Sequence, residues 1–217
     1  MKLIKIFRNI NIFTFLTFLI FLIFLISYDT FVVFAETKKI ENTEQKEYKI
    51  TNMISIDFEN YKKIRLILNN YFVIEGIKFY SDGTIEFPYY LAKNKIKYIS
   101  IIFIDKNLER HILDIIKKEK YLENNFEFNT ESVNFEVKKI TKLETKGTRL
   151  ANVDLLIDNK FIIVLGIMAG KKGKNKWIAY PAEKIDNYYH NQIYFLNQKL
   201  KDRIEKNILE KYEKQDF

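Results

Sequence analysis

An internal repeat constrains this sequence most, because a unit that occurs twice must fold in nearly the same way twice. Residues 63–72 and 152–161 each contain an apolar run, a polar pair and a closing aromatic residue. Further matches follow in the same order at offsets of 89 to 93 residues, and they include the two prolines of the chain. The matched positions are Gly76 with Gly166, Pro88 with Pro181, Phe103 with Phe195, and Leu108, Ile112 and Ile116 with Leu200, Ile204 and Ile208. Chance similarity between two segments rich in lysine and isoleucine is the competing explanation.

Each copy of the repeat predicts an antiparallel β-meander followed by a C-terminal α-helix. Alternating apolar residues such as Val133, Phe135 and Val137 are typical of half-buried strands. The pairs Asn69-Asn70 and Asp158-Asn159 suit two-residue hairpin turns, which need positive φ angles. We expect strands at 48–58, 63–68 and 71–79 in the first copy, at 133–142, 150–157 and 160–168 in the second, and a short strand ending at each proline.

Apolar residues four apart predict the closing helices. In the second copy this stripe begins at Leu196 and ends at Ile208. Such a stripe is core packed on the sheet or, alternatively, a surface for a partner. We expect Tyr188 and Tyr189 to pack against the sheet and His190 to lie near the start of this helix. The predicted fold is α+β, with two tandem units after an N-terminal apolar helix.

The N-terminus has the pattern of a targeting segment. Basic residues precede 17 largely apolar residues, 10–26, and Val33 with Ala35 fits the spacing that signal peptidase reads. A length of 17 lies between a signal peptide and a membrane-spanning anchor, so a cleaved signal peptide and an uncleaved anchor that reaches the membrane through 10–26 are both open. The positive flank predicts that residues 36–217 end outside the cytoplasmic membrane. If this segment is misread, the protein is cytoplasmic.

These patterns divide the chain into five parts. They are a signal peptide or anchor (1–35), a charged flexible linker (36–47), the first copy (48–122), a second linker (123–132) and the second copy (133–214).

Composition excludes several kinds of chemistry. The chain has no cysteine and two histidines, which rules out disulfides, thiolate metal sites and a histidine-rich metal centre. No sequence motif of an enzyme is complete: the Gly-rich stretch 166–172 lacks the glycine spacing and the Ser/Thr of a nucleotide-binding loop. We therefore expect no enzymatic activity and no cofactor.

The net charge of +8 is compatible with a polyanionic partner, although lysine-rich composition alone could explain it. Residues 131–217 hold 17 basic and 12 acidic residues, a net charge of +5, whereas residues 36–130 hold 16 and 15, a net charge of +1. Any surface that binds anions is therefore expected mainly in the second copy.

A basic loop is the best local candidate for such a surface. Lysines in a loop can neutralise phosphates, and nearby aromatic rings can stack on bases. The candidate residues are Lys171, Lys172, Lys174, Lys176 and Trp177. The alternative is a solvated hairpin tip with Trp177 in the core.

The second copy resembles the SpoVG family, the stage V sporulation and septation protein G proteins. The matching residues, over about 133–212, are Val137, Ile140, Gly147, Leu150, Ala151, Val153, Ile157, Asp158, Phe161, Gly166, Ile167, Gly173 and the run Trp177-Ile178-Ala179-Tyr180-Pro181, with a closing helix that reaches Leu209 and Tyr212. The first copy resembles the family mainly through the second. Within this match we assign structural roles to Asp158, Phe161, Gly166 and Pro181.

The resemblance implies a small dimeric α+β protein with roles in septation and sporulation, which binds DNA and RNA and has no enzymatic activity. Two copies on one chain could pair as an internal pseudo-dimer, in place of a homodimer. The chain departs from the family in its N-terminal segment and after Pro181, where only Lys184 retains the family's basic stretch. The open alternative is a protein–protein interaction module of the cell envelope that has lost nucleic-acid binding.

Overall fold

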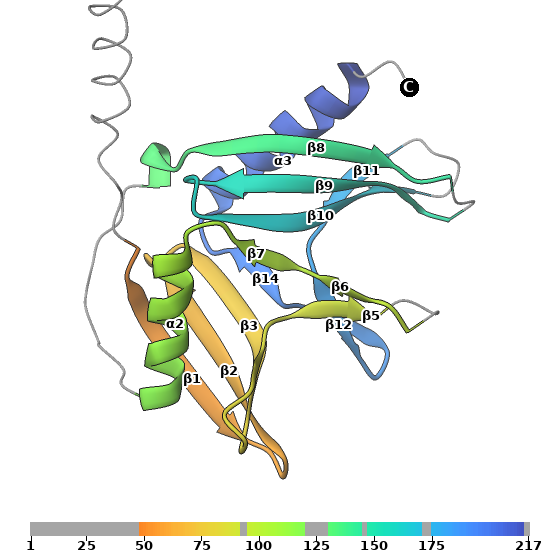
Figure 1. The fold of residues 1–217 in the computed structure, drawn as a ribbon. Helices are drawn as coiled ribbons and strands as arrows, with labels where there is room; N and C mark the ends of the chain where they lie inside the picture. Colours follow the sequence, from red (N-terminus) through yellow and green to blue (C-terminus); the bar gives the residue numbers. More distant parts are fainter. Residues whose placement is uncertain (1–47, 92–94, 120–129, 145–146, 171–174, 215–217) are drawn as a thin grey trace, which may run out of the picture. The chain divides into compact units, whose positions relative to one another are not determined.

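Two antiparallel sheets carry most of the protein, whose computed structural model describes residues 48–91, 95–119, 130–144, 147–170 and 175–214 (Figure 1). The predicted signal or anchor segment (1–35) and the first linker (36–47) lie outside the described residues, as does most of the second linker. Residues from Tyr48 onward form one compact unit, and the hydrophobic core draws its described residues entirely from this unit. The described part of the core therefore lies within this unit.

The first sheet has the strand order β1-β2-β3-β14, and the second has the order β11-β10-β9-β8. The strands of the first are β1 (Ile50–Asp57), β2 (Tyr61–Leu68), β3 (Phe72–Tyr80) and β14 (Ile193–Phe195), with β4 (Ile85–Glu86) also on β3. Those of the second are β8 (Phe135–Lys142), β9 (Arg149–Ile157), β10 (Phe161–Ala169) and β11 (Lys176–Ala179), with β7 (Ile101–Phe103) also on β10.

Two short hairpins and two helices complete the described chain. The hairpins are β5 (Tyr89–Leu91) with β6 (Lys97–Ile99), and β12 (Ala182–Ile185) with β13 (Tyr188–Asn191). Helix α2 (Lys106–Lys118) follows β7 and lies over the first sheet in Figure 1, and α3 (Gln198–Lys214) follows β14 and contacts β8 and β11 of the second. A 3-10 turn (Thr130–Ser132) precedes β8.

The two halves exchange a strand. In β14, a strand of the second half, Phe195 pairs with Phe72 of β3, whereas Phe103 in β7, from the first half, pairs with Phe161 of β10. Each strand leads into a helix that returns to the sheet of its own half. Neither sheet is therefore built from one half alone.

Most of the predicted elements are confirmed. The α+β class, the six long strands and the two helices are found near the expected bounds. Both two-residue turns have positive φ, at 49° and 57° for Asn69 and Asn70 and 46° and 56° for Asp158 and Asn159. Positive φ angles at both turn residues are required for a two-residue turn whose twist matches that of the strands it joins.

Several finer predictions are wrong around β13 and the start of α3. His190 lies in β13 rather than near the helix, and Tyr188 and Tyr189 are each 74% exposed instead of packed on a sheet. Leu196 is exposed and precedes α3. The helix begins after Asn197, whose side chain caps it by accepting a hydrogen bond from the Leu200 amide (2.8 Å). Both short hairpins and the strands β7 and β14 were not anticipated.

Four phenylalanines fill the junction between the sheets. The rings of Phe72 and Phe161 stack with centroids 4.7 Å apart, and both are fully buried. Phe195 packs on Phe72 at 5.4 Å, and Phe103 packs on Phe161 at 6.2 Å. The exchanged strands thus place their aromatic side chains on the ring pair that joins the halves.

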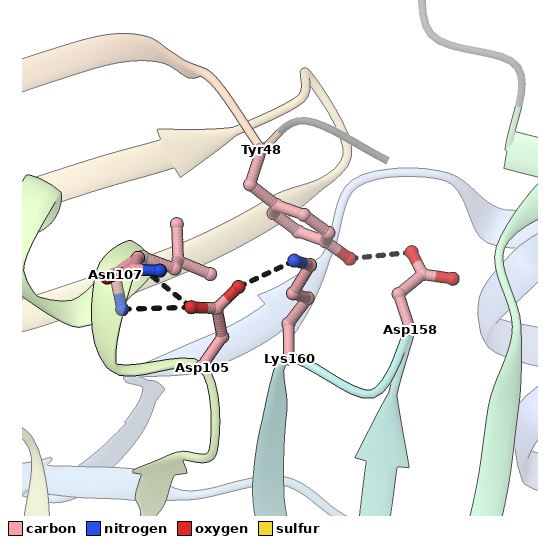
Figure 2. A network of polar contacts seen from close by, with 6 residues as sticks. Tyr48, Asp105, Asn107, Asp158 and Lys160 are labelled. Atoms are coloured by element: carbon pink, nitrogen blue, oxygen red, sulfur yellow. Dashed lines mark hydrogen bonds and ion pairs between the residues drawn. The ribbon is translucent and has the colours of Figure 1, made fainter. Parts of the chain in front are cut away.

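A polar network ties the same junction together (Figure 2). The hydroxyls of Tyr48 and Tyr71 contact each other, and Tyr48 donates a hydrogen bond to Asp158 Oδ2 (2.7 Å). Burial raises the pKa of both tyrosines, so they remain protonated donors. Beside them Lys160 Nζ lies 2.5 Å from Asp105 Oδ2, across the two halves.

Asp105 also caps α2. Its Oδ1 accepts hydrogen bonds from the amides of Asn107 (2.9 Å) and Leu108 (3.1 Å). The hydrogen bond from Lys160, followed by the one from the Leu108 amide, holds the pKa of the Asp105 carboxyl below its usual range. One carboxylate therefore both starts a helix and joins the halves.

We expect Phe161→Ala to lower the free energy of unfolding by about 3–5 kcal/mol, because it leaves a cavity at the junction. Phe58→Ala is the matched control, since the Phe58 side chain is 49% exposed. Urea unfolding of residues 36–217 measures both. Equal losses of unfolding free energy in the two variants would show that the Phe161 side chain does not stabilise the junction more than an exposed phenylalanine does.

We expect Asp105→Asn to keep the helix cap but to lose the ion pair, at a cost of about 1 kcal/mol near neutral pH. Because the pKa of Asp105 is depressed in the folded state, its contribution is present above the unfolded pKa and lost as pH falls through the folded one. Urea unfolding at pH 7 and pH 3 should show the gap between wild type and variant closing at the lower pH. A gap that does not change with pH would show that Lys160 and Asp105 do not form a stabilising pair.

Candidate functional site

The two short hairpins flank an open groove with a cavity volume of about 350 Å3. Residues of β3 and β4, of the β5–β6 hairpin and of the β12–β13 hairpin line it. Figure 1 shows the backbone of these elements. We call it the hairpin groove; its lining residues include Gly76, Glu86, Tyr89, Tyr90, Leu91, Glu183, Lys184, Tyr189 and Gln192. Both halves of the chain contribute side chains to this groove.

A glycine makes the base of the hairpin groove possible. Gly76 has φ +84°, a left-handed conformation that favours glycine, at a register shift in the β2–β3 pair. A Cβ there would lie 3.0 Å from Nε2 of Gln192, so Gly76 also leaves room for that side chain. The backbone of Gln192 makes two hydrogen bonds. Its carbonyl accepts one from the Glu75 amide (2.6 Å), and its amide donates one to the Pro181 carbonyl (2.7 Å).

The two acidic side chains of the hairpin groove are neutralised. Lys97 pairs with Glu86 and also lies 4.3 Å from the ring centroid of Tyr89. Lys63 pairs with Glu183 at 3.1 Å. Lys184, by contrast, is exposed and has no carboxylate partner within the described part of the chain. An anion entering the groove would meet Lys184 without displacing an existing ion pair.

Aromatic side chains stand beside this lysine. Tyr189 lies directly opposite Lys184 in the β12–β13 ladder, and Tyr188 is its exposed neighbour. On the other hairpin, Tyr90 pairs with Tyr98 and each is more than half exposed. Solvent-exposed rings beside a lysine can hold a flat or apolar group while the ammonium binds an anion.

Lys176, the one basic-loop lysine among the described residues, does not line the hairpin groove with Lys184. Lys171, Lys172 and Lys174 lie outside the described residues. Lys176, on β11, pairs with Glu213 of α3 at 3.2 Å and lies 5.5 Å from the ring of Tyr212. Lys184 lies beyond Pro181 on a different strand and lines the hairpin groove.

Trp177 is 46% exposed, so the alternative that places its side chain in the core is wrong. It lies on β11, which has β10 as its one pairing neighbour among the described strands, and faces solvent at that edge of the second sheet. The indole is therefore available to stack on a ligand near the basic loop.

The four residues expected to have structural roles all lie in supporting positions. Phe161 is part of the aromatic junction, and Asp158 Oδ1 accepts a hydrogen bond from the Asn134 amide (2.7 Å). A Cβ on Gly166 would lie 2.9 Å from Nε of Arg149, so the glycine leaves space for this half-buried guanidinium. Pro181 ends the path along β11 and turns the chain into β12.

The exposed tyrosines of the hairpins were missed at the level of sequence. A usable pattern was present, because Asp186-Asn187 has the same composition as the turn Asp158-Asn159, and Asp186 has φ 54°. Reading it as a hairpin turn would have placed Ile185 opposite Tyr188 and Lys184 opposite Tyr189, as observed.

Two properties of the described residues bear on the kind of site. No group of three or more His, Cys, Asp or Glu side chains there could hold a metal ion. No helix in the described ranges is long and apolar enough to cross a membrane.

Comparison with known proteins locates the family in the second half of the chain. The family model of SpoVG matches residues 134–214. A protein of Lachnospira eligens that is named as a septation protein, SpoVG, is 30% identical over 81 residues, which cover 36% of this chain and 90% of the relative. No solved structure matches the chain. Through its C-terminal half, the chain belongs to the SpoVG family.

Proposed function

We propose that the chain consists of two tandem SpoVG-like units that pack as an internal pseudo-dimer with exchanged strands. The support is that the same contacts occur twice. β14 adds to β3 as β7 adds to β10, and the Lys49 amide donates to Asn69 Oδ1 as the Asn134 amide donates to Asp158 Oδ1, both at 2.7 Å. A duplicated and fused dimer accounts for this correspondence.

We propose that the protein is a non-enzymatic binding protein with a role related to septation, and that it binds unpaired nucleic acid or a similar polyanion weakly. One observation carries this proposal: Lys184, which has no carboxylate partner among the described residues, lies opposite the exposed Tyr189 on the β12–β13 hairpin. Lysine neutralises phosphate, and tyrosine rings stack on bases whatever their sequence. The basic loop with Trp177 would extend the same kind of contact.

We further propose that residues 36–217 function outside the cytoplasmic membrane. The basis is the N-terminal pattern, with positive residues before the apolar run 10–26 and small residues before Glu36. A polyanion of the cell envelope would then be a more accessible ligand than cytoplasmic DNA or RNA.

A second candidate function is a protein–protein interaction module of the envelope. The edge strand β1 favours it, because this strand presents Ile54 and Ile56, which are 45% and 57% exposed. Rows of exposed apolar side chains on a sheet edge are characteristic of surfaces that pair with another chain.

The internal pseudo-dimer predicts that residues 36–217 are a monomer. Light scattering coupled to size-exclusion chromatography measures the mass directly, and we expect the mass of one chain across a wide concentration range. An obligate dimer would contradict the proposal, because each sheet already receives its exchanged strand from the same chain.

Nucleic-acid binding predicts retardation of single-stranded DNA and RNA that weakens steeply with salt in a gel-shift titration of residues 36–217. Changing Tyr188 and Tyr189 to Ser should weaken binding by about 1–3 kcal/mol per stacked base that is lost. Lys184→Glu should weaken it more than Lys199→Glu on α3, an exposed lysine with the same change of charge.

Three results would decide against this assignment. A loss caused by changing Lys171, Lys172 and Lys174 to Glu, with no effect of Lys184→Glu, would move the site to the basic loop. Equal losses for Lys184→Glu and Lys199→Glu would indicate unspecific charge attraction. Absence of retardation even at low salt would leave the second candidate function.

A further inference from the structure

The outer edge of β1 has backbone groups that pair with no other described strand. Among the described strands, β1 pairs with β2 alone. At the hairpin that joins them, the Phe58 amide donates to the Tyr61 carbonyl (2.9 Å). Since antiparallel residues bond inward and outward in alternation, Ile56 and Ile54 bond to β2, whereas Met53, Ser55 and Asp57 direct their amides and carbonyls outward.

This edge lacks the features that usually prevent pairing with another chain. Proteins protect edge strands with lysines, prolines, bulges or short lengths. β8, which has the corresponding place in the second sheet, carries Lys138, Lys139 and Lys142 and has a register shift in its middle. β1 is equally long, has no lysine, arginine or proline, and has its register shift at its first residues. One sheet edge is protected and its counterpart is open.

The side chains of β1 offer an apolar row and one acidic group. Ile54, Ile56 and Phe58 project from one face and are 45%, 57% and 49% exposed. On the opposite face, the side chain of Asp57 is 83% exposed and lies 3.8 Å from Lys62, whose closer partner is Glu119. The Asp57 carboxylate is therefore only weakly neutralised.

We propose that the outer edge of β1 binds an extended segment of a partner protein, which adds to the first sheet as an antiparallel strand. The segment has apolar residues opposite Ile54, Ile56 and Phe58 and a basic residue opposite Asp57. Backbone hydrogen bonds to Met53, Ser55 and Asp57 supply the attachment, and the alternating side chains supply the selectivity. The proposal names the partner for the second candidate function, on which it rests, and does not involve the hairpin groove.

A second copy of the chain fits this edge less well. β1 contains no basic residue. Two β1 strands paired with each other therefore have no cation to place opposite Asp57, whereas a basic partner segment does. The charge of Asp57 thus favours a different chain over a second copy.

The probe is a labelled peptide, Val-Lys-Val-Thr-Val-Thr, which places its lysine opposite Asp57 when antiparallel. Fluorescence anisotropy with residues 36–217 measures its binding. In the added strand, the amides of the lysine and threonines point toward β1 and those of the valines point away. N-methylation of the lysine and threonine amides should weaken binding by about tenfold or more, because several hydrogen bonds to β1 are lost. N-methylation of the valines should change it little.

The protein itself supplies a matched pair of variants. Ser55→Pro removes an amide that faces solvent in the unbound edge, where proline is tolerated, so the fold should persist while peptide binding is lost. Ser55→Thr keeps the amide and should bind like the wild type. Replacing the peptide lysine by glutamate should weaken binding through repulsion from Asp57. If Ser55→Pro fails to fold, the two methylated peptides still decide.

The following outcomes would overturn the proposal. Equal binding of the two methylated peptides would show that no strand is added, and failure of the unmodified peptide to bind would remove the site. Self-association of the protein that Ser55→Pro abolishes would assign the edge to a second copy. Nucleic-acid retardation should be unchanged in Ser55→Pro, so failure of the groove and failure of the edge are distinguishable.

Discussion

The exchange of β7 and β14 is the constraint on which the rest of the structure depends. Each is three residues long, too short to be stable without neighbours, and each completes a sheet of the opposite half. Their aromatic residues, Phe103 and Phe195, pack on the stacked pair of Phe161 and Phe72. Because the same strands lead out of the two hairpins and into the two helices, the junction also fixes where the hairpin groove lies. Unpairing the exchanged strands would separate the two hairpins that line the groove.

The buried polar groups at the junction make this arrangement specific. Hydrophobic stacking alone tolerates small shifts, whereas the hydrogen bond from Tyr48 to Asp158 and the Lys160–Asp105 contact each require particular positions of the two halves. Both interactions join residues far apart in the chain. The Tyr48 ring also packs edge to face on Phe161, with ring centroids 5.6 Å apart. Apolar and polar contacts therefore select the same packing of the halves.

The sequence predicts the local structure well because local structure has local causes. Alternation of apolar residues identifies β8, pairs of Asn and Asp identify the two-residue turns, and four-residue spacing identifies α2 and α3. The exchange leaves no such trace, since three residues such as Ile101–Phe103 have no measurable period and their partner strand lies 60 residues away in β10. The tyrosines of β13 were misplaced for a related reason. Apolar character suggested burial, although a two-stranded hairpin has no second layer to bury Tyr188 and Tyr189.

The two proposed surfaces differ in a way that follows from the two halves being unequal. In the second half the edge strand β8 is protected by lysines, and the hairpin carries Lys184 with exposed tyrosines. In the first half the edge strand β1 has no lysine and pairs, among the described strands, with β2 alone, and one cation of the hairpin, Lys97, is paired with Glu86. The two subunits of a homodimer are identical, so their edge strands and hairpins must be alike. In a chain that holds both halves, the edge strand and the hairpin of each half can change separately. The differences between the two edge strands and between the two hairpins are then compatible with one fold, because neither difference involves the aromatic junction that the halves share.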